Sequence, residues 1–450
     1  MKKNDIVKLK ITSMTAQGSG VGRTESGIVV FVPYAAVGDE IEAKILKLKK
    51  TYAYGKIERI ITPSPSRVNP DCSAFGKCGG CVLRHIDYNS EKEIKYQRVT
   101  DAVNRIGGLF DIKINEVVEN DFVCRYRNKA QLPCQEINGE IEFGFYAGHS
   151  HRIVPFDDCL LQPELFNKVI KITKDFMTRT SQTAYNELTR KGKLRHLYIR
   201  YAEKTDELMI CYVVNGNGLK REDELIKELK DSLPNLKSVI FNSNRENTNV
   251  VLGKRNRVAY GKDYIEDILC GKRFRISPLS FYQVNRSQAE KLYNIAKDYA
   301  GLKGGEVLLD LYCGTGTIGL TMAESCKKLI GVEIIEDAVK DAYKNAEING
   351  IDNAEFICGD APFAADKLKN DGIKPDVIIV DPPRKGLTES LINTIAQMNP
   401  DRIVYVSCDP ETLARDLKQF TEKHYSVKEI TPVDLFSRTP HIENVALIVR

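Results

Sequence analysis

The chain has 450 residues, a length that suggests two or three domains. Its 42% hydrophobic and 28% charged residues are ordinary for a globular protein, and no apolar run of about 18 residues is present to span a membrane. The first residues, MKKNDIVKLKITS, lack the apolar stretch of a secretory signal, so we expect a cytoplasmic protein. The net charge of +5 indicates an acidic partner only weakly, because solubility alone explains it.

Residues 1–62 are predicted to form a small β-barrel. Short runs such as VKLKI and GIVVFV alternate with glycine-rich turns, which is typical of strands in a barrel of the OB type. Such barrels often bind nucleic acid, and a purely structural barrel is the alternative. The segment TPSPSR (62–67) then predicts a linker.

Three cysteines follow the linker within the sequence CSAFGKCGGC, and they are Cys72, Cys78 and Cys81. Disulfides are not expected in a cytosolic chain, so this CX5CX2C spacing indicates a metal-binding turn. Four thiolates bind either zinc or a [4Fe–4S] cluster, and the spacing alone does not distinguish them. Cys124 and Cys134 are the fourth ligands that the sequence itself suggests.

Residues 63–275 are predicted to form a mixed α+β central domain. Apolar residues recur at helical spacing over 91–108, which predicts an amphipathic helix that we expect to pack on the catalytic domain. Alternating strands such as HLYIRYA and ELMICYVV follow, but their order in a sheet cannot be predicted.

Residues 276–450 are predicted to form a Rossmann-like α/β domain. Helical segments alternate with apolar runs at 307–312, 328–333, 354–360, 376–381 and 402–408. Repeating βα units indicate a parallel sheet with helices on both faces, and ligands bind outside the carboxyl ends of its strands.

The first of these strands continues into D310-LYCGTGTIGL, where Gly314 and Gly316 precede a helix. The next two strands end at Glu333 and Asp360, which are suited to bind a ribose and an adenine amino group. This order of strand, turn, helix and two acids favours a nucleoside cofactor. The GxGxxG spacing makes NAD the alternative, whereas the opening DLYCGTG is similar to S-adenosylmethionine-dependent methyltransferases.

The fourth and fifth strands end in D381-PPRKG and in S407-CDP. Pro382 and Pro383 lack an N–H and stop their strand, which places Asp381 at the ligand edge. Cys408 ends the next strand, so Asp381 and Cys408 are expected at neighbouring tips beside the cofactor. A cysteine that merely packs in a core has no reason to lie there.

Taken together, these motifs resemble the RNA uracil-C5 methyltransferases of the 23S ribosomal RNA type. The resemblance runs nearly end to end and covers the barrel, which is similar to a TRAM domain, the cysteine cluster, FYQVN (281–285), DLYCGTGTIGL, DPPRKG, SCDP and HIENVAL (441–447).

The resemblance implies that Cys408 is a nucleophile that adds to uracil C6 and that Glu443 is the base that removes the C5 proton. It also implies a set of residues around the methyl donor S-adenosylmethionine: Gln283, Tyr312, Thr317, Glu333, Asp360 and Asp381. Phe281 is expected to stack on the cofactor or a base, with core packing as the alternative.

By the same resemblance, Cys159 is the fourth ligand of a [4Fe–4S] cluster with a structural role, and 23S ribosomal RNA is the partner. Basic segments at 124–131, 253–257 and 271–275 are expected to contact this RNA, with Tyr126 and Phe274 stacking on bases. The alternatives are a transfer-RNA uracil methyltransferase, a non-catalytic iron–sulfur RNA-binding protein and a small-molecule methyltransferase. No obligate protein partner is predicted.

Overall fold

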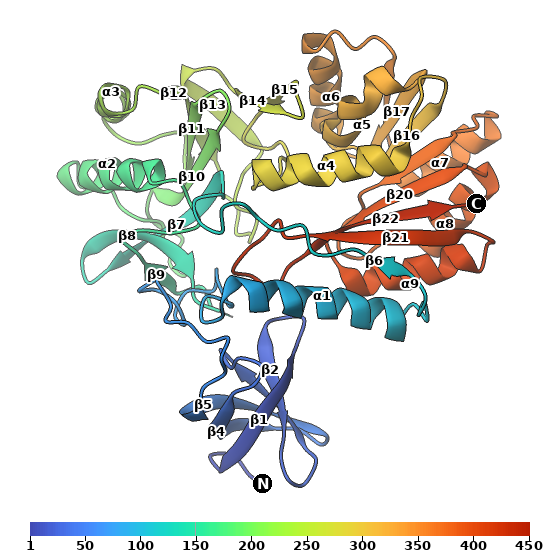
Figure 1. The fold of residues 1–450 in the computed structure, drawn as a ribbon. Coiled ribbons are helices and arrows are strands. Elements are labelled where there is room, and N and C mark those ends of the chain that lie inside the picture. The colour runs from blue at the N-terminus through green and yellow to red at the C-terminus, as the bar shows by residue number, and fades with distance from the viewer. Residues whose placement is uncertain (149) are drawn as a thin grey trace.

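The structure, a computed structural model, describes residues 1–148 and 150–450. The strands of these residues form a closed barrel, a seven-stranded sheet, a two-stranded hairpin and an eight-stranded sheet. Figure 1 shows the barrel at the bottom, the seven-stranded sheet at the upper left and the eight-stranded sheet on the right. Within the described part of the chain, no helix is long and apolar enough to cross a membrane.

The N-terminal barrel confirms the prediction for this region. Its strands are β1 (Ile6–Met14), β2 (Ser19–Arg23), β3 (Val29–Pro33), β4 (Glu40–Leu48) and β5 (Tyr52–Thr62). They pair in the order β1-β2-β3-β5-β4, and β1 closes the barrel on β4. Alternate side chains such as Leu9, Ile11, Val30 and Val32 fill the interior, as the two-residue period of a strand requires.

The helix expected at 91–108 is α1 (Tyr88–Arg105). It begins three residues earlier because the Asp87 side chain accepts a hydrogen bond from the Ser90 N–H and caps the first turn. In Figure 1 this helix runs between the barrel and the rest of the molecule, and it packs against α9 (Pro410–Thr421).

The middle of the chain forms the seven-stranded sheet, in the order β13-β12-β11-β10-β7-β8-β9. These strands are β7 (Lys129–Ile137), β8 (Glu140–Tyr146), β9 (Ile153–Pro155), β10 (Leu194–Ala202), β11 (Glu207–Val214), β12 (Leu236–Ser243) and β13 (Arg255–Gly261). Helices α2 (Leu165–Arg179) and α3 (Glu222–Ser232) pack on this sheet, and a hairpin of β14 (Ile265–Leu269) and β15 (Lys272–Ile276) follows it.

The eight-stranded sheet has the order β18-β17-β16-β19-β20-β22-β21-β6. Its parallel strands are the five that the sequence predicts: β16 (Val307–Leu311), β17 (Lys328–Glu333), β18 (Ala354–Cys358), β19 (Val377–Val380) and β20 (Arg402–Ser407). The helices between and around them are α4 (Arg286–Ala300), α5 (Thr317–Met322), the short 3-10 helix η1 (Ala323–Ser325), α6 (Glu336–Ile348), α7 (Ala361–Asn370), α8 (Glu389–Met398) and α9.

Both faces of this sheet are buried, which explains why its strands are apolar throughout. Leu308 and Val377 belong to the core cluster on one face, whereas Leu309 and Ile378 belong to the cluster on the other. Antiparallel strands β21 (Ser426–Val433) and β22 (Glu443–Val449) extend the sheet beyond β20. This is the Rossmann-like architecture that the sequence predicts.

One strand of this sheet comes from far earlier in the chain. The short β6 (Lys113–Ile114) pairs in parallel with β21 at the edge of the sheet. Residues 88–114 therefore pack with the C-terminal unit, although they lie within the 63–275 segment that we assigned to the central domain. We expected the helix of this segment to pack on the catalytic domain, but the sequence did not indicate the pairing of β6 with β21, because a two-residue strand has no periodic signal of its own.

Candidate active site

The turn after β16 brings α5 very close to the strand. Tyr312, Gly314 and Gly316 all have left-handed backbone angles, with φ of 69°, 57° and 81°. The Gly319 N–H donates to Asp310 Oδ2 at 2.9 Å, and a Cβ at Gly319 would lie only 2.8 Å from that oxygen. Because glycine has no Cβ, the backbone forms a tight loop that a ligand can approach closely.

Glu333 and Asp360 lie at the carboxyl ends of β17 and β18, as expected. One oxygen of Glu333 accepts from the Gly314 N–H at 3.1 Å, which fixes its carboxylate beside the glycine turn. Asp360 is exposed and makes no capping hydrogen bond to α7. Both acids therefore present oxygen atoms at the edge where ligands of such sheets bind.

Three further residues that we predicted at the cofactor site lie at the start of α5 or just before α4. Thr317 begins α5, and its hydroxyl lies 3.2 Å from that of Tyr293 on α4. Gln283 is buried before α4, and its carbonyl accepts from the Asn128 side chain at 3.0 Å. Phe281 is 61% exposed, which excludes core packing and leaves its ring free for a ligand.

Sequence reasoning missed two apolar residues at this edge. Ile334 and Phe363 are 63% and 72% exposed and follow Glu333 and Asp360 in the chain. Large exposed apolar side chains beside polar groups are typical of ligand sites. The signal that the sequence offered was an isoleucine directly after the acid that ends a strand.

Cys408 and Glu443 lie at the same end of neighbouring strands. In the antiparallel pairing of β20 with β22, Ser407 is opposite Asn444. The next two opposing positions, beyond the carboxyl end of β20, are therefore Cys408 and Glu443. Asp381 follows β19, the parallel neighbour of β20. The structure thus brings together the three reactive side chains that the motifs indicate.

Asp381 and Glu443 remain protonated at a higher pH than ordinary carboxyl groups, because burial disfavours their charged forms. Burial raises the pKa of Asp381 to about 7. It also raises the pKa of Glu443 to about 8, with a further contribution from Asp381 and an opposing one from Arg384. Acids whose pKa lies near neutrality can both accept and donate protons under physiological conditions.

Cys408 itself is held as a thiol. Burial and the charges of Glu443 and Asp381 together raise its pKa to about 11, and Arg384 opposes them. A cysteine that attacks a carbon atom either ionises to the thiolate beforehand or loses its proton during the attack. The raised pKa favours the second course, because almost no thiolate is present at neutral pH.

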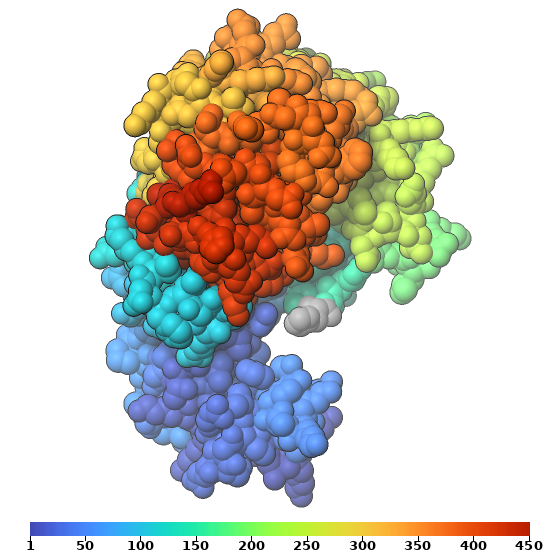
Figure 2. All heavy atoms as spheres, turned by 90° about the vertical axis from the view of Figure 1, so that its right-hand side faces the viewer, coloured from blue at the N-terminus to red at the C-terminus, as the bar shows by residue number. Residues whose placement is uncertain are grey.

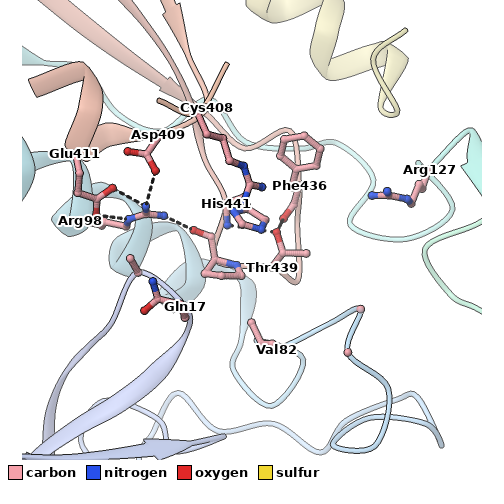
Figure 3. Close-up of a pocket in the computed structure, with 15 residues that line it drawn as sticks. Gln17, Val82, Arg98, Arg127, Cys408, Asp409, Glu411, Phe436, Thr439 and His441 are labelled. Carbon is pink, nitrogen blue, oxygen red and sulfur yellow. Dashed lines mark hydrogen bonds and ion pairs between the residues drawn. The ribbon is translucent and has the colours of Figure 1, made fainter. Parts of the chain in front are cut away.

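Cys408 opens onto a cavity of about 740 Å³ that several parts of the chain line (Figure 3). Gln17 comes from the barrel, Gly80 from the cysteine segment and Arg98 from α1. The guanidinium of Arg98 is fixed by both oxygens of Glu411, at 3.0 and 2.7 Å. The cavity is large enough for a nucleotide, which is a ligand of the size that such pockets hold.

His441 is a further lining residue whose role the sequence did not specify. Burial lowers the pKa of its imidazole to about 4, and the cations Arg384 and Arg98 contribute. The ring is therefore neutral at physiological pH and lies edge-to-face with Phe436, with their centroids 6.2 Å apart. Neutral aromatic rings are suitable surfaces for an unstacked base.

A second cavity, of about 180 Å³, is lined by Cys72, Cys78, Cys81 and Cys159. Cys134 is buried in the core of the seven-stranded sheet instead, and Cys124 does not line the cavity. Within residues 1–148 and 150–450, no three Cys, His, Asp or Glu side chains converge closely enough to hold a metal ion.

The predicted RNA-binding segments differ in their placement. Residues 124–131 supply Arg127 to the 740 Å³ cavity. The segments 253–257 and 271–275 lie at the beginning of strands β13 and β15 and do not line this cavity. Stacking by the two named aromatics was a wrong expectation. Phe274 is fully buried, and Tyr126 is buried with its hydroxyl bonded to the Ser437 carbonyl. The sequence of a basic segment does not indicate which of its aromatic side chains are buried in the core.

The glycine turn, the acids at successive strand ends and the parallel sheet define an S-adenosylmethionine-dependent methyltransferase fold. A family model described as tRNA (Uracil-5-)-methyltransferase matches residues 219–450, and a TRAM domain model matches residues 2–57. The chain belongs to this family of uracil-5-methyltransferases.

Relatives and a solved structure agree with this assignment. A protein of Clostridium tetani described as an RNA methyltransferase is 45% identical over 448 residues, covering 100% of this chain and 97% of its own. One of Caldanaerobacter subterraneus is 44% identical and covers 98% of both chains. The Pyrococcus abyssi tRNA (uracil-54, C5)-methyltransferase, solved with S-adenosyl-L-homocysteine, matches with a TM-score of 0.78 and 28% identity over 98% of this chain and 99% of its own.

Proposed function

We propose that this protein methylates C5 of a uridine in 23S ribosomal RNA. The observation that carries the proposal is the cavity of Cys408, which the barrel, the cysteine segment and α1 all line. A base in a stacked helix cannot reach such a sulfur, so the target nucleotide is extruded or lies in a single-stranded loop. Contacts from the barrel and the cysteine segment then hold the RNA on either side.

Cys408 acts as the nucleophile. As its thiol proton passes to a neighbouring base, the sulfur bonds to uracil C6, and the electrons of the C5–C6 double bond move to the C4 carbonyl as an enolate. S-adenosylmethionine supplies a methyl group that carbon C5 can attack. Glu443 then removes the C5 proton, and those electrons restore the double bond and expel the thiolate. A pKa of about 8 suits Glu443 to accept and release that proton near neutral pH.

The residues around the glycine turn hold the methyl donor. Glu333 has the position to accept from ribose hydroxyls and Asp360 from the adenine amino group, with Ile334 and Phe363 against the ring. Gln283, Tyr312 and Thr317 surround the rest of the donor. Asp381 lies between this site and Cys408, where it holds the uracil or borders the reacting methyl group.

The four cysteines of the second cavity hold a [4Fe–4S] cluster in this proposal. Methyl transfer needs no electron from it, so its role is to shape the segment 78–82. That segment contributes Gly79, Gly80 and Val82 to the wall of the catalytic cavity.

Transfer RNA is the second candidate substrate. The matching structure from Pyrococcus abyssi is a tRNA enzyme, which favours this alternative, whereas the combined motifs of the chain favour ribosomal RNA. Incubation of unmodified 23S ribosomal RNA and tRNA transcripts with methyl-labelled S-adenosylmethionine decides between them. Label at a uridine C5 in ribosomal RNA supports the proposal, and label only in tRNA overturns it.

A further inference from the structure

Three cations come together next to the catalytic cavity without an acid among them. Lys129 begins β7 and lies directly opposite Arg200 of β10 in the antiparallel register. Arg127 precedes Lys129 by two residues and lines the cavity that contains Cys408. Like charges opposite each other on neighbouring strands are destabilising, so this group weakens the fold that contains it.

The hydrogen bonds of the group leave its charges uncompensated. Arg200 is buried and donates to the Tyr198 hydroxyl and the Ser280 carbonyl, which are both neutral. In the part of the chain that the structure describes, the side chains of Lys129 and Arg127 have neither a hydrogen-bond partner nor an ion-pair partner. Removing cations from water without an opposite charge is costly, and an anionic ligand would offset that cost.

The electrostatics of Lys129 reflect this environment. Burial and the charges of Arg200 and Arg127 together lower the pKa of its ammonium group to about 7. Both charged neighbours that act on this half-buried lysine are cations, whereas lysines that proteins remove from water are usually paired with an acid. An anion that binds next to Lys129 would raise the pKa of its ammonium group and thereby favour the charged form.

The arginines that line the cavity differ in their availability. Arg98 is occupied by Glu411 and by the Pro440 carbonyl, as the dashed lines in Figure 3 show. Arg127 lies on the other side of the cavity in that view and has no such partner among the labelled residues. Arg127 can therefore receive a ligand without breaking an existing ion pair.

The backbone around the cations is held firmly. The Asn128 N–H donates to the Val284 carbonyl at 2.8 Å, and its side chain donates to the Gln283 carbonyl at 3.0 Å. The group is thus fixed against the segment before α4, between the catalytic cavity and the predicted cofactor residues. Binding groups held in place in advance lose little entropy when a ligand binds.

We propose that Arg127 and Lys129, with Arg200 behind them, bind a phosphate of the RNA backbone next to the nucleotide that enters the Cys408 cavity. This inference rests on the proposed RNA methylation and adds a phosphate site to it. The carboxylate of the methyl donor is the competing anion. RNA is favoured because Arg127 shares its cavity with Gln17 of the barrel, whereas no residue of the glycine turn lines that cavity.

The test uses the full-length variants Lys129→Gln and Arg127→Gln, with Lys227→Gln as the control. Lys227 is an exposed lysine on α3, so its substitution removes one charge at a remote position. Binding of unmodified 23S ribosomal RNA and tRNA transcripts is measured at several salt concentrations in the presence of S-adenosyl-L-homocysteine. Binding of S-adenosyl-L-homocysteine alone is measured by calorimetry.

Each site variant is expected to bind RNA roughly tenfold or more weakly at low salt, which is typical for the loss of one charged hydrogen bond. The slope of log affinity against log salt should fall by about 0.7 to 1. The control should retain the affinity and slope of the wild type, and all variants should bind S-adenosyl-L-homocysteine equally.

Wild-type RNA affinity and slope in Lys129→Gln would overturn the inference. So would a loss of S-adenosyl-L-homocysteine binding with unchanged RNA binding, which would assign the cations to the donor. A folding defect is recognised by thermal unfolding, where Lys129→Gln is expected to be at least as stable as the wild type. If the wild type methylates neither RNA but the site variants still weaken RNA binding, the proposed function fails and the phosphate site stands.

Discussion

Cys408 and Glu443 face each other across the antiparallel pair β20 and β22, one residue beyond the pairing of Ser407 with Asn444. The two residues are 35 positions apart in the sequence (443 − 408), but the return of the last strand to the centre of the sheet places them side by side. In the reaction that we propose, a nucleophile and a proton acceptor on two paired strands are held at a fixed separation, as the two steps of addition and elimination require.

Substitution of either residue should stop methylation at a different step. Cys408→Ala removes the sulfur that adds to uracil, so turnover should be lost while RNA binding persists. Glu443→Gln leaves addition and methyl transfer intact but blocks proton removal, so a covalent protein–RNA adduct should accumulate. The adduct is measured by denaturing gel electrophoresis with labelled RNA. Methyl transfer by Cys408→Ala at the wild-type rate would contradict the proposed mechanism and favour a non-catalytic RNA-binding role for the cysteine.

The raised pKa of Cys408 predicts low reactivity in the free protein. With a pKa of about 11, only about one thiol in ten thousand is ionised at pH 7, so alkylation by iodoacetamide should be slow and should accelerate up to that pH. Arg384→Gln should slow it further, because that guanidinium stabilises the thiolate. The measurement needs a Cys358→Ser background, since Cys358 is exposed and would react as well. Rapid alkylation of Cys408 at pH 7 would be incompatible with its burial.

Three buried acids predict that stability falls as the pH rises. Burial raises the pKa of Asp310 and Glu443 to about 8 and that of Asp381 to about 7. Between the ordinary carboxyl pKa and these values, the folded state binds more protons than the unfolded state, so the free energy of unfolding decreases with increasing pH. The midpoint of thermal unfolding should therefore be higher near pH 5.5 than near pH 8.5.

The variants Asp381→Asn and Glu443→Gln provide the control for this pH dependence. Each removes one ionisable group, so each should flatten the slope of the free energy of unfolding against pH in the range from about 5 to 8. A slope in both variants identical to that of the wild type would show that these acids do not titrate in that range.

The predictions from sequence succeeded where local patterns determine structure. The five parallel strands at 307–408 and the barrel at 1–62 follow from runs of β-branched residues and turn glycines, and the structure contains them all. The position of Asp381 and Cys408 at neighbouring strand ends could also be predicted, because the residues that end the strands of a parallel sheet share one edge. Lys129 and Arg200 could not be paired in advance, since their contact depends on the register of two strands more than sixty residues apart.

Buried polar networks were also beyond prediction. Glu91 and Lys95 look like an ordinary exposed pair on an amphipathic helix, but both are buried against the loop between β21 and β22. The helical period predicts that this polar face of the helix is exposed to solvent. The contact of Lys95 with Asp434 shows that another segment of the chain covers it instead.

The four cysteines of the second cavity predict an iron-containing protein. After anaerobic purification, the wild type should contain iron and show a broad absorption band near the blue, whereas Cys159→Ser should lose most of both. Cys124→Ser is the matched control, because Cys124 does not line the cavity and should be dispensable. Zinc without iron in the wild type, or equal iron loss in the two variants, would refute the ligand set. The measurements are elemental analysis and ultraviolet–visible spectroscopy.

The ammonium of Lys95 is predicted to hold the loop that carries Phe436, Thr439 and His441 into the cavity. It donates to Glu91 at 2.8 Å and to Asp434 at 2.6 Å, and all three side chains are buried. Replacing only the lysine leaves the buried Asp434 without a cation and leaves Glu91 with Arg438 as its remaining ion-pair partner. Lys95→Met should therefore lower the free energy of unfolding by about 3–5 kcal/mol.

The neighbouring Lys92 offers a control for this substitution. It pairs with Glu119, whose side chain is 60% exposed, so Lys92→Met should cost at most about 1 kcal/mol. Chemical denaturation of both variants measures the difference. Since the loop positions His441 beside Cys408, Lys95→Met should also weaken RNA binding at temperatures where the variant remains folded. Equal stability of Lys92→Met and Lys95→Met would show that the buried network contributes nothing to holding the loop.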